Sequence, residues 1–451
     1  MRKQERRAWM CLVLAVVLFG GVALFGFRFV KDGGKWASFY GNSQIYTDGV
    51  LNRGEVTDRN GEMLLNLSRD GAEYNNDAYI RMSTVHAVGD PNGNIASGAI
   101  SIFRSQLIGY DLLNGTYDTS KSGKKISLTI DAKANAAALN ALGGRTGAVG
   151  VYNWKTGEIM CMVSTPTFDP AYDVPDDGTS YYFNNFLDGA MTPGSIFKLV
   201  TAAAVIDNVP DRDSYEFDCD GVNEYSGVDF TDIKSHGELD FRGALAQSCN
   251  GAFGELTRKV GSKTMKEYAE KSGLTKAVEF DGIKTAKGSF DFPSDDNVKL
   301  SWAGIGQADD LVNPCAMMVY AGAVANGGEA TQPTLIKDTS FISEIKDAAD
   351  LNGGRSMGRY LDKETAAELR SMMKNDVVDN YGEENFPDMD IYAKSGTAQV
   401  GTDAPDSWFV GFTDDSDAPY AFVVWVKGGG YGSEAAAPIA RTVIQQLKED
   451  N

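Results

Sequence analysis

The stretch GAMTPGSIFKLVTAAAV, residues 189–205, places one serine and one lysine in an almost apolar segment. Lys198 follows Ser195 by three residues, and residues i and i+3 share one face of a helix. The helix predicted here is apolar nearly all round and should be buried, so its lysine must snorkel, pair or lose its proton. Because desolvation lowers the pKa of a lysine, Lys198 is a candidate base for a Ser195 nucleophile.

A structural role for Ser195 is the alternative. Pro193-Gly194 signals a turn, and a serine just after a turn is favoured at a helix start, where its oxygen accepts free backbone N–H groups. The Ser-x-x-Lys spacing does not decide between the two roles, because it also occurs at Ser122, Ser343 and Ser371.

The two histidines limit which side chain could act as the base for a serine nucleophile. His86 and His236 are the only two in the chain, and neither has a serine-triad context. Nor does Ser195 lie in a Gly-x-Ser-x-Gly elbow. If Ser195 is a nucleophile, a lysine must therefore act as its base.

Two further motifs follow Ser195. Ser248-Cys249-Asn250 is the only Ser-x-Asn in the chain, and it combines a hydroxyl that relays protons with an amide that holds a substrate carbonyl. A polar loop or helix start would explain it equally well. Lys-[Ser/Thr]-Gly occurs at 121, 155, 271 and 394. The first two copies indicate turns and the third a helix end. Only Lys394 begins a copy on an alternating strand, where Gly396 would let a ligand approach the backbone closely.

The ordered set S-x-x-K, S-x-N and K-[ST]-G is the signature of penicillin-binding proteins and serine β-lactamases. Over about residues 124–449 the chain resembles the transpeptidase domain of high-molecular-mass, class B penicillin-binding proteins. Upstream, RGEVTDRNG resembles an element of that family's N-terminal pedestal domain. The segments that carry the resemblance to the transpeptidase domain are LTIDAKANAAALNAL, GAVGVYNWKTGEIMCMVSTPTFDP, TPGSIFK, HGELDFRGALAQSCNGAFGEL, NPCAMMVYAGAVANGG, AKSGTAQ and SWFVGF.

The resemblance implies a peptidoglycan D,D-transpeptidase. Ser195 would attack the carbonyl between the two terminal D-alanines of a stem peptide, and Lys198 would accept its proton. Ser248 would pass a proton to the leaving D-alanine, with Lys394 keeping the network electropositive, while Asn250 would hold the substrate's peptide carbonyl. β-Lactams would acylate the same serine.

The strand motif would hold the other end of the substrate. Ser395 and Thr397, on either side of Gly396, would bind the terminal carboxylate with help from the Lys394 charge. The backbone N–H groups of Ser195 and Thr397 would form the oxyanion hole. The resemblance implies no cofactor, and a multi-pass glycan polymerase as partner.

The order of expected elements predicts an α+β fold, with an antiparallel sheet flanked by helices and a helical lobe. Four units are expected: a cytoplasmic tail over 1–8, a transmembrane anchor over 9–30, a pedestal over 31–123 and the transpeptidase domain over 124–451. The expected elements are two strands in 53–66 around Asn60-Gly61, a linker over 111–125, a strand over 126–130, a helix over 131–142, a hairpin over 147–166, helical segments across about 195–330, strands over 390–400, 407–413 and 420–428, and a helix over 435–449.

Charge and the N-terminus indicate where the protein works. MRKQERR is basic and precedes nineteen uncharged residues from Trp9 to Phe27, close to the roughly 20 that cross a bilayer. A cleaved signal peptide is less consistent, since its apolar core should be about 7–15 residues long. The basic flank should stay in the cytoplasm, which places residues 31–451 outside. The net charge of −20 argues against binding to nucleic acid.

Some features depart from the family or stay open. GIGQADDLVNP has Ala308 where the family often has the second glycine of Gly-Gln-Gly. A D,D-carboxypeptidase, a β-lactam hydrolase and an antibiotic sensor share the fold and stay as alternatives. The cysteines show no zinc spacing, and a disulfide among Cys161, Cys219, Cys249 and Cys315 stays open.

Overall fold

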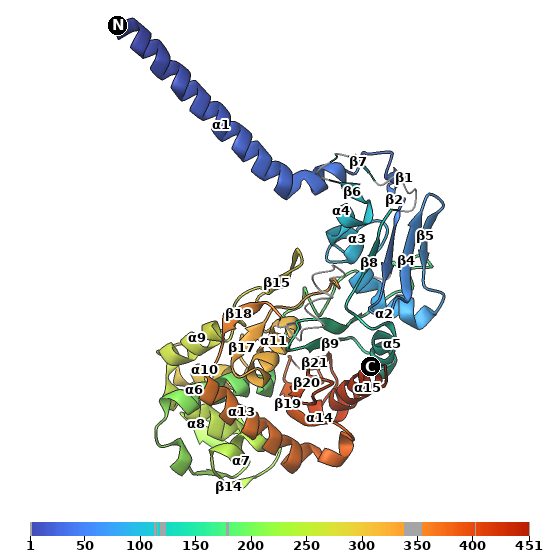
Figure 1. Ribbon diagram of the computed structural model, residues 1–451. Helices are drawn as coiled ribbons and strands as arrows, with labels where there is room; N and C mark the ends of the chain where they lie inside the picture. The colour runs from blue at the N-terminus through green and yellow to red at the C-terminus, as the bar shows by residue number, and fades with distance from the viewer. Residues whose placement is uncertain are drawn as a thin grey trace.

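A single long helix leads into the folded body of the protein. The computed structural model describes residues 2–111, 114, 116–117, 123–176, 180–337, 354–401 and 403–450. Helix α1 (Arg2–Ala37) projects from the body as a rod (Figure 1) and contains one candidate membrane span, with a mean hydropathy of 2.6 over 18 residues. None of that window is buried against the protein. The predicted anchor over 9–30 lies within α1, and its large apolar side chains are free to face lipid.

The body begins with a small four-stranded sheet. The expected turn at Asn60-Gly61 is confirmed, since it joins the first two strands and Asp58 Oδ1 accepts the N–H groups of Asn60 and Glu62 at 2.8 Å each. The sheet has the order β5-β4-β3-β8, and β8 runs parallel to β3. Its strands are β3 (Gly54–Thr57), β4 (Met63–Ser68), β5 (Gly71–Tyr74) and β8 (Lys125–Ser127).

Short elements surround this sheet. The linker predicted over 111–125 is only partly correct, because Thr116–Tyr117 forms β7 and Lys125 begins β8; positions 112–113, 115 and 118–122 lie outside the described residues. The other elements are β1 (Tyr46–Thr47), β2 (Val50–Leu51), α2 (Ala78–Val88), α3 (Ala99–Ile102), α4 (Arg104–Leu107) and β6 (Tyr110–Asp111).

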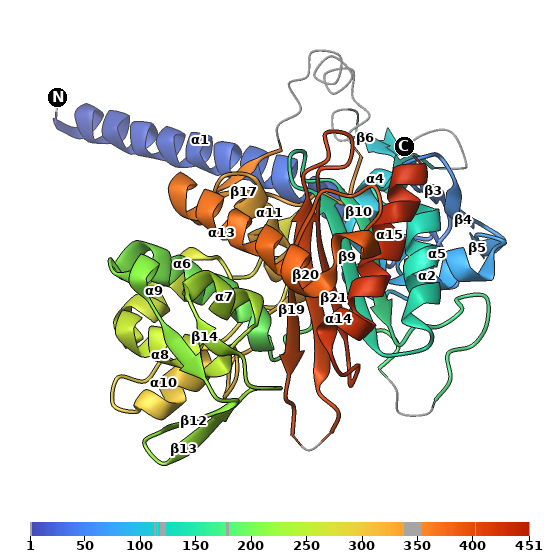
Figure 2. The same cartoon turned by 90° about the horizontal axis from the view of Figure 1, so that it is seen from below.

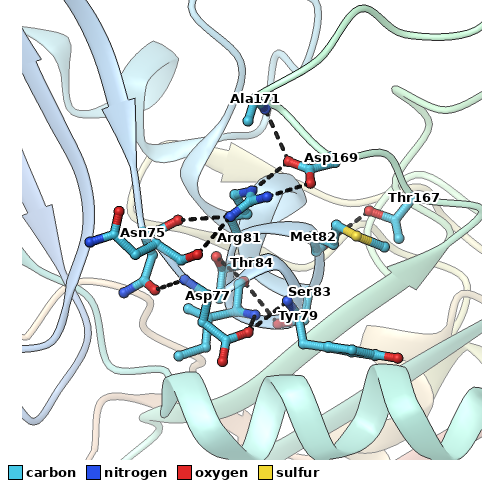
Figure 3. Close-up of polar contacts among 12 residues, drawn as sticks. Asn75, Asp77, Tyr79, Arg81, Met82, Ser83, Thr84, Thr167, Asp169 and Ala171 are labelled. Atoms are coloured by element: carbon cyan, nitrogen blue, oxygen red, sulfur yellow. Dashed lines mark hydrogen bonds and ion pairs between the residues drawn. The ribbon is translucent and has the colours of Figure 1, made fainter.

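Polar contacts of helix α2 connect the N-terminal part to the segment after β10 (Figure 3). Asp77 caps the helix by accepting the N–H groups of Tyr79 and Ile80. From the first turn, Arg81 binds both oxygens of Asp169, at 2.5 and 2.7 Å, in a forked ion pair. Thr167 Oγ1 donates to the carbonyl of Met82 at 2.7 Å. These contacts join segments more than 80 residues apart into one body.

The central sheet has five antiparallel strands in the order β10-β9-β21-β20-β19. Each strand expected from the sequence is present, and every position of β10, β20 and β21 is buried. Helices on both faces account for this burial, so the residues of these strands are buried at successive positions rather than at alternate ones. The strands are β9 (Gly147–Asn153), β10 (Ile159–Thr165), β19 (Ile391–Ala398), β20 (Asp406–Thr413) and β21 (Tyr420–Val426).

Two helical layers cover this sheet (Figure 2). Helices α5 (Ala132–Leu142) and α15 (Ala437–Glu449) pack on one face, and the fully buried α11 (Pro314–Ala325) packs on the other. Strand β21 alternates between the layers: Phe422 and Val424 face α15, while Val423 and Trp425 join the core on the α11 side. The predicted Asp131 cap is confirmed, because its side chain accepts the N–H of Ala134. The expected α+β architecture is therefore confirmed.

A helical lobe lies beside β19 (Figure 2), as predicted for about 195–330. The prediction missed three short hairpins, because their strands are short and largely polar and give no apolar period. The helices are α6 (Lys198–Asn208), α7 (Phe241–Ala246), α8 (Asn250–Val260), α9 (Ser262–Lys271), α10 (Asn297–Gly304) and α13 (Lys363–Asp376), with α14 (Gly432–Ala435) near the sheet. The missed hairpin strands are β11 (Phe217–Cys219), β12 (Val222–Tyr225), β13 (Val228–Thr231), β14 (Gly237–Leu239), β15 (Glu279–Phe280) and β16 (Ile283–Lys284), and β17 (Glu329–Thr331) pairs with β18 (Ser356–Arg359).

The loop between α10 and α11 contains a backbone conformation that suits glycine. Ala308, the position where the sequence departs from the family, has φ +65°. For a residue with a Cβ this left-handed conformation costs about 1–2 kcal/mol. Two residues before it, Gly306 has φ +76° and lies against the turn that carries Ser195.

We therefore expect Ala308→Gly to stabilise the protein. Relief of the left-handed strain exceeds the added entropy of the unfolded chain, so the free energy of unfolding should rise by about 0.5–1 kcal/mol. Urea unfolding of the full chain in detergent measures this change. The matched control is Ala367→Gly on the exposed side of α13, which should lower the same free energy by about 1 kcal/mol. A loss of stability in both variants would contradict the strain at Ala308.

Candidate active site

Ser195 lies on a tight turn that packs against β19 of the central sheet. Residues Gly194–Phe197 form a 3₁₀-helix, and α6 begins only at Lys198. Gly194 has φ +54°, and a Cβ there would come within 2.6 Å of the carbonyl oxygen of Thr397 on β19. Pro193 and Phe197 occupy the cap positions, neither with a side-chain cap bond. Ser195 is therefore not a helix cap, which was the structural role considered for it.

Lys198 is fully buried below Ser195. Its Nζ donates to Asn250 Oδ1 at 2.8 Å and to Ser248 Oγ at 3.2 Å, and it also bonds the carbonyl oxygen of Ser248. Burial lowers the pKa of Lys198 to about 7, with a smaller contribution from the charge of Lys394 that is opposed by Asp232. Close to neutral pH the amine is therefore partly unprotonated, which is one of the three outcomes expected for a lysine in an apolar helix.

One detail differs from the expected geometry. Within the described part of the chain, no hydrogen bond joins Lys198 Nζ to Ser195 Oγ; the amine is held by the Ser248 and Asn250 side chains. The i, i+3 spacing places the two residues on one side of the turn, but the lysine's bonds go to a segment 50 residues away. Sequence spacing alone could not predict that choice of partner.

Ser248 and Asn250 occupy the turn before α8. Ser248 has φ +55°, which is uncommon for a residue with a side chain. Asn250 is the first residue of α8, and its backbone N–H donates to Asp232 Oδ1 at 2.8 Å. Its side-chain Nδ2 donates to the carbonyl of Thr231 at 2.8 Å. The amide orientation is thus set from both ends, with Oδ1 aimed at Lys198.

Strand β19 supplies the K-S-G motif from the other side. Lys394 is fully buried, and its Nζ lies 3.1 Å from the carbonyl oxygen of Ser395. A Cβ on Gly396 would come within 2.9 Å of Ile196 Cγ2 and 3.2 Å of Ile196 N. The glycine therefore lets β19 pack against the Ser195 turn, a reason that differs from the predicted approach of a ligand. The other copies of the tripeptide that the structure describes form a turn at Gly157 and the end of α9 at Gly273, as expected.

These segments enclose a cavity of about 620 Å³. All eight predicted site residues meet at it: five line the cavity, and Lys198, Lys394 and Gly396 are buried behind its wall. The lining residues are Ser195, Thr231, Asp232, Ile233, His236, Gln247, Ser248, Asn250, Trp302, Ile305, Gln307, Ser395, Thr397, Gln399, Pro405 and 430–433. A buried amine of lowered pKa beside a serine and a row of hydroxyls is suited to acyl transfer.

The family model of the penicillin binding protein transpeptidase domain matches residues 147–445, more than half of the chain. The chain belongs to this family. The peptidoglycan D,D-transpeptidase PbpA of Mycobacterium tuberculosis is 26% identical over 368 residues, or 72% of each chain. PbpA of Mycolicibacterium smegmatis is 26% identical over 455 residues, covering 88% of this chain and 89% of that one.

Solved structures show the same penicillin-binding fold. Penicillin-binding protein A from M. tuberculosis, as its imipenem acyl-enzyme complex, has a TM-score of 0.74 at 23% identity, covering 88% of this chain and 98% of that one. The D,D-transpeptidase domain of a peptidoglycan glycosyltransferase from Eggerthella lenta has a TM-score of 0.72 at 24% identity, with the same coverage. The expected resemblance to class B penicillin-binding proteins is confirmed.

The candidate active site includes a buried network that the sequence did not predict. Asp376, at the end of α13, is fully buried 3.5 Å from Lys394 Nζ and accepts a hydrogen bond from Tyr381 OH at 3.0 Å. Tyr381 OH in turn lies 2.8 Å from Ser395 Oγ and accepts the backbone N–H of Ser395 at 2.7 Å. Burial raises the pKa of the Asp376 carboxyl, and the Lys394 charge offsets part of that shift. The motif is thus held from behind by one carboxylate and one phenol.

A second unpredicted group borders the cavity, and its residue types are those that bind metals. Cys219, Asp232, His236 and Cys249 place their ligand atoms within 4.8 Å of one another. The four residues are spread over 31 positions with no CxxC pair, so their spacing does not resemble a zinc motif. All four cysteines outside α1 are free thiols, which resolves the open question of a disulfide in this structure.

We expect Asp376→Asn to destabilise the protein and to slow acylation. Removing one partner of a buried pair leaves Lys394 uncompensated, which lowers the free energy of unfolding by about 3–5 kcal/mol. Ser395 should also lose its alignment. Urea unfolding and the rate of labelling by a fluorescent penicillin measure the two effects. The matched control is Glu267→Gln, which removes the exposed partner of Lys263 and should change both little. Unchanged labelling in Asp376→Asn would show that the network does not position the motif.

Proposed function

We propose that this penicillin-binding transpeptidase cross-links peptidoglycan stem peptides through an acyl-enzyme on Ser195. The observation that supports this most directly is the buried Lys198 amine, poised between the Ser195 turn and the Ser248–Asn250 turn. The relatives named peptidoglycan D,D-transpeptidase support the choice of substrate. The structural neighbours captured as imipenem and penicillin G acyl-enzymes support acylation by β-lactams.

In the first half-reaction Ser195 Oγ attacks the carbonyl carbon between the two terminal D-alanines. Lys198 accepts the hydroxyl proton, which a partly neutral amine does readily near pH 7. The proton then passes through Ser248 Oγ, 3.2 Å from Lys198 Nζ, to the leaving nitrogen. The peptide C–N bond breaks, an ester to Ser195 forms and D-alanine leaves.

Two groups of contacts would hold the substrate during this step. Asn250 presents its amide to the substrate's peptide carbonyl, and Ser395 and Thr397 bind the terminal carboxylate beside the Lys394 charge. The backbone N–H groups of Ser195 and Thr397 form the oxyanion hole, worth roughly 3–4 kcal/mol per donor. In the second half-reaction the amine of another stem peptide attacks the ester and restores the Ser195 hydroxyl.

The N-terminal part would place this chemistry outside the cell. Residues 9–30 of α1 cross the membrane, residues 1–8 stay in the cytoplasm on their basic flank, and the body faces the wall. Residues 31–123 act as a pedestal, completed by β8 from the following segment, and residues 124–451 form the transpeptidase domain. The resemblance to class B penicillin-binding proteins supports a multi-pass glycan polymerase as the partner that would supply its substrate.

The deciding experiment follows the intact mass of the full chain in detergent after penicillin is added. We expect one stable adduct per chain, and none with Ser195→Ala. A D-Ala-D-Ala peptide with an added amine acceptor should then give amide product in preference to acid. Preferred release of the acid would make the protein a D,D-carboxypeptidase, and rapid loss of the penicillin adduct with turnover would make it a hydrolase. An adduct that persists in Ser195→Ala would contradict the assigned nucleophile.

The pH dependence of acylation tests Lys198 separately. Only the neutral amine accepts the Ser195 proton, so the acylation rate constant should rise as pH passes through about 7 and level off above it. The measurement is the rate of fluorescent-penicillin labelling between about pH 5.5 and 9. In Lys198→Arg the charge persists throughout this range, and labelling should stay low at every pH. A rate that falls with rising pH would rule out this role.

A further inference from the structure

Three segments of the helical lobe converge beside the active-site cavity. Cys219 ends β11, Asp232 follows β13, His236 precedes β14, and Cys249 sits just before α8. Both cysteines are buried, whereas Asp232 and His236 are half-buried and line the cavity. Two thiols, an imidazole and a carboxylate are the donor set of tetrahedral zinc sites.

The distances between the donor atoms fit one metal ion. Cys219 Sγ lies 3.3 Å from His236 Nδ1 and 3.5 Å from Asp232 Oδ2, and Cys249 Sγ lies 3.2 Å from the same carboxylate oxygen. A tetrahedral zinc with sulfur at about 2.3 Å and nitrogen or oxygen at about 2.0–2.2 Å separates its donors by roughly 3.3–3.8 Å. These three separations are at or near the values that a zinc ion requires, and all four donor atoms lie within 4.8 Å of one another.

Backbone contacts hold these donors in place. The N–H of His236 donates to the carbonyl of Cys219 at 3.0 Å, and β11 pairs with β14 directly after it. Cys249 Sγ accepts the N–H of Ala252 at 3.4 Å in the first turn of α8.

We propose that Cys219, Asp232, His236 and Cys249 form a structural zinc site. Zinc binding displaces the two thiol protons, so that two thiolates, one carboxylate and a neutral imidazole coordinate the divalent ion. Soft sulfur together with nitrogen and oxygen favours zinc over magnesium or calcium, which prefer all-oxygen sites. The site goes beyond the proposed transpeptidase function and does not depend on it.

The position of the site links it to the catalytic turn. Cys249 lies between Ser248 and Asn250, the two residues whose side chains hold Lys198. The other oxygen of Asp232 accepts the backbone N–H of Asn250 at 2.8 Å. Bound zinc would therefore connect the β11–β14 strand pair to the turn formed by Ser248, Cys249 and Asn250. Its four ligands act as positioning residues. Its removal should loosen the orientation of Ser248 and Asn250.

The test begins with the metal content of the full chain in detergent, purified without chelator. We expect one zinc per chain by mass spectrometry, and close to none in Cys219→Ala. Cys315→Ala is the matched control, because it removes a buried thiol outside the cluster and should keep the zinc. Cobalt exchanged into the unmodified protein should show a thiolate-to-cobalt charge-transfer band, a readout that needs no variant to fold.

Chelation tests the link to the catalytic turn. Zinc removal should slow fluorescent-penicillin labelling on the order of 10–100-fold, as expected for small misplacement of reacting groups, and added zinc should restore the rate. The same treatment should leave Cys219→Ala unaffected. A chain without zinc and without the cobalt band would overturn the site, as would a mass lower by two hydrogens that assigns Cys219 and Cys249 to a disulfide. If the purified protein contains zinc but zinc removal leaves the labelling rate unchanged, the positioning role is overturned. Loss of labelling in Ser195→Ala tests the proposed function and not the zinc site.

Discussion

The burial of two lysines next to each other is the constraint on which this active site depends. Each ammonium group costs several kcal/mol to desolvate, and the structure offsets that cost differently at each site. Lys394 keeps a carboxylate partner, Asp376, whereas Lys198 has neutral oxygen acceptors from Ser248 and Asn250. The result is one lysine paired with a buried carboxylate and one whose pKa burial lowers to about 7. The same residue type thus serves both as the candidate base and as the partner of a buried acid.

Close packing between a turn and a strand brings these lysines together. The Ser195 turn meets β19 where Gly194 and Gly396 leave no room for side chains, and Gly194 N–H donates to the carbonyl of Gly306 at 2.8 Å. The buried five-stranded sheet keeps β19 rigid, since helices cover both of its faces. The cavity therefore lies between a rigid sheet and a helical lobe. Its wall on the lobe side includes Thr231 at the end of β13 and Asp232, Ile233 and His236 from the segment that leads to β14.

Polar contacts across the lobe explain how such a wall is held. Asp232 joins β13 to the start of α8, and Asp376 with Tyr381 joins the end of α13 to β19. The same principle operates at the N-terminal side, where Arg81 and Asp169 form a forked pair between α2 and the segment after β10. Apolar burial builds the layers, and a few partly or fully buried charged groups set how the layers meet.

The sequence by itself determined the long apolar N-terminal helix, the strands and helices of the central layers, and the eight residues around the cavity. Those conclusions rest on local information: an uncharged run, apolar periodicity, turn glycines, and three ordered motifs typical of one family. The short hairpins were missed because polar strands of two to four residues have no period to detect.

Only the tertiary structure decided which partners the buried charges have. Lys198 bonds residues 50 and 52 positions away rather than Ser195, and Lys394 pairs with Asp376 on another element. The cluster of Cys219, Asp232, His236 and Cys249 also exists only once three segments fold together. The physical reason is common to all three cases. A buried polar group must find its partner among whatever the packing brings within about 3 Å, and that neighbourhood is not a property of any local stretch of chain.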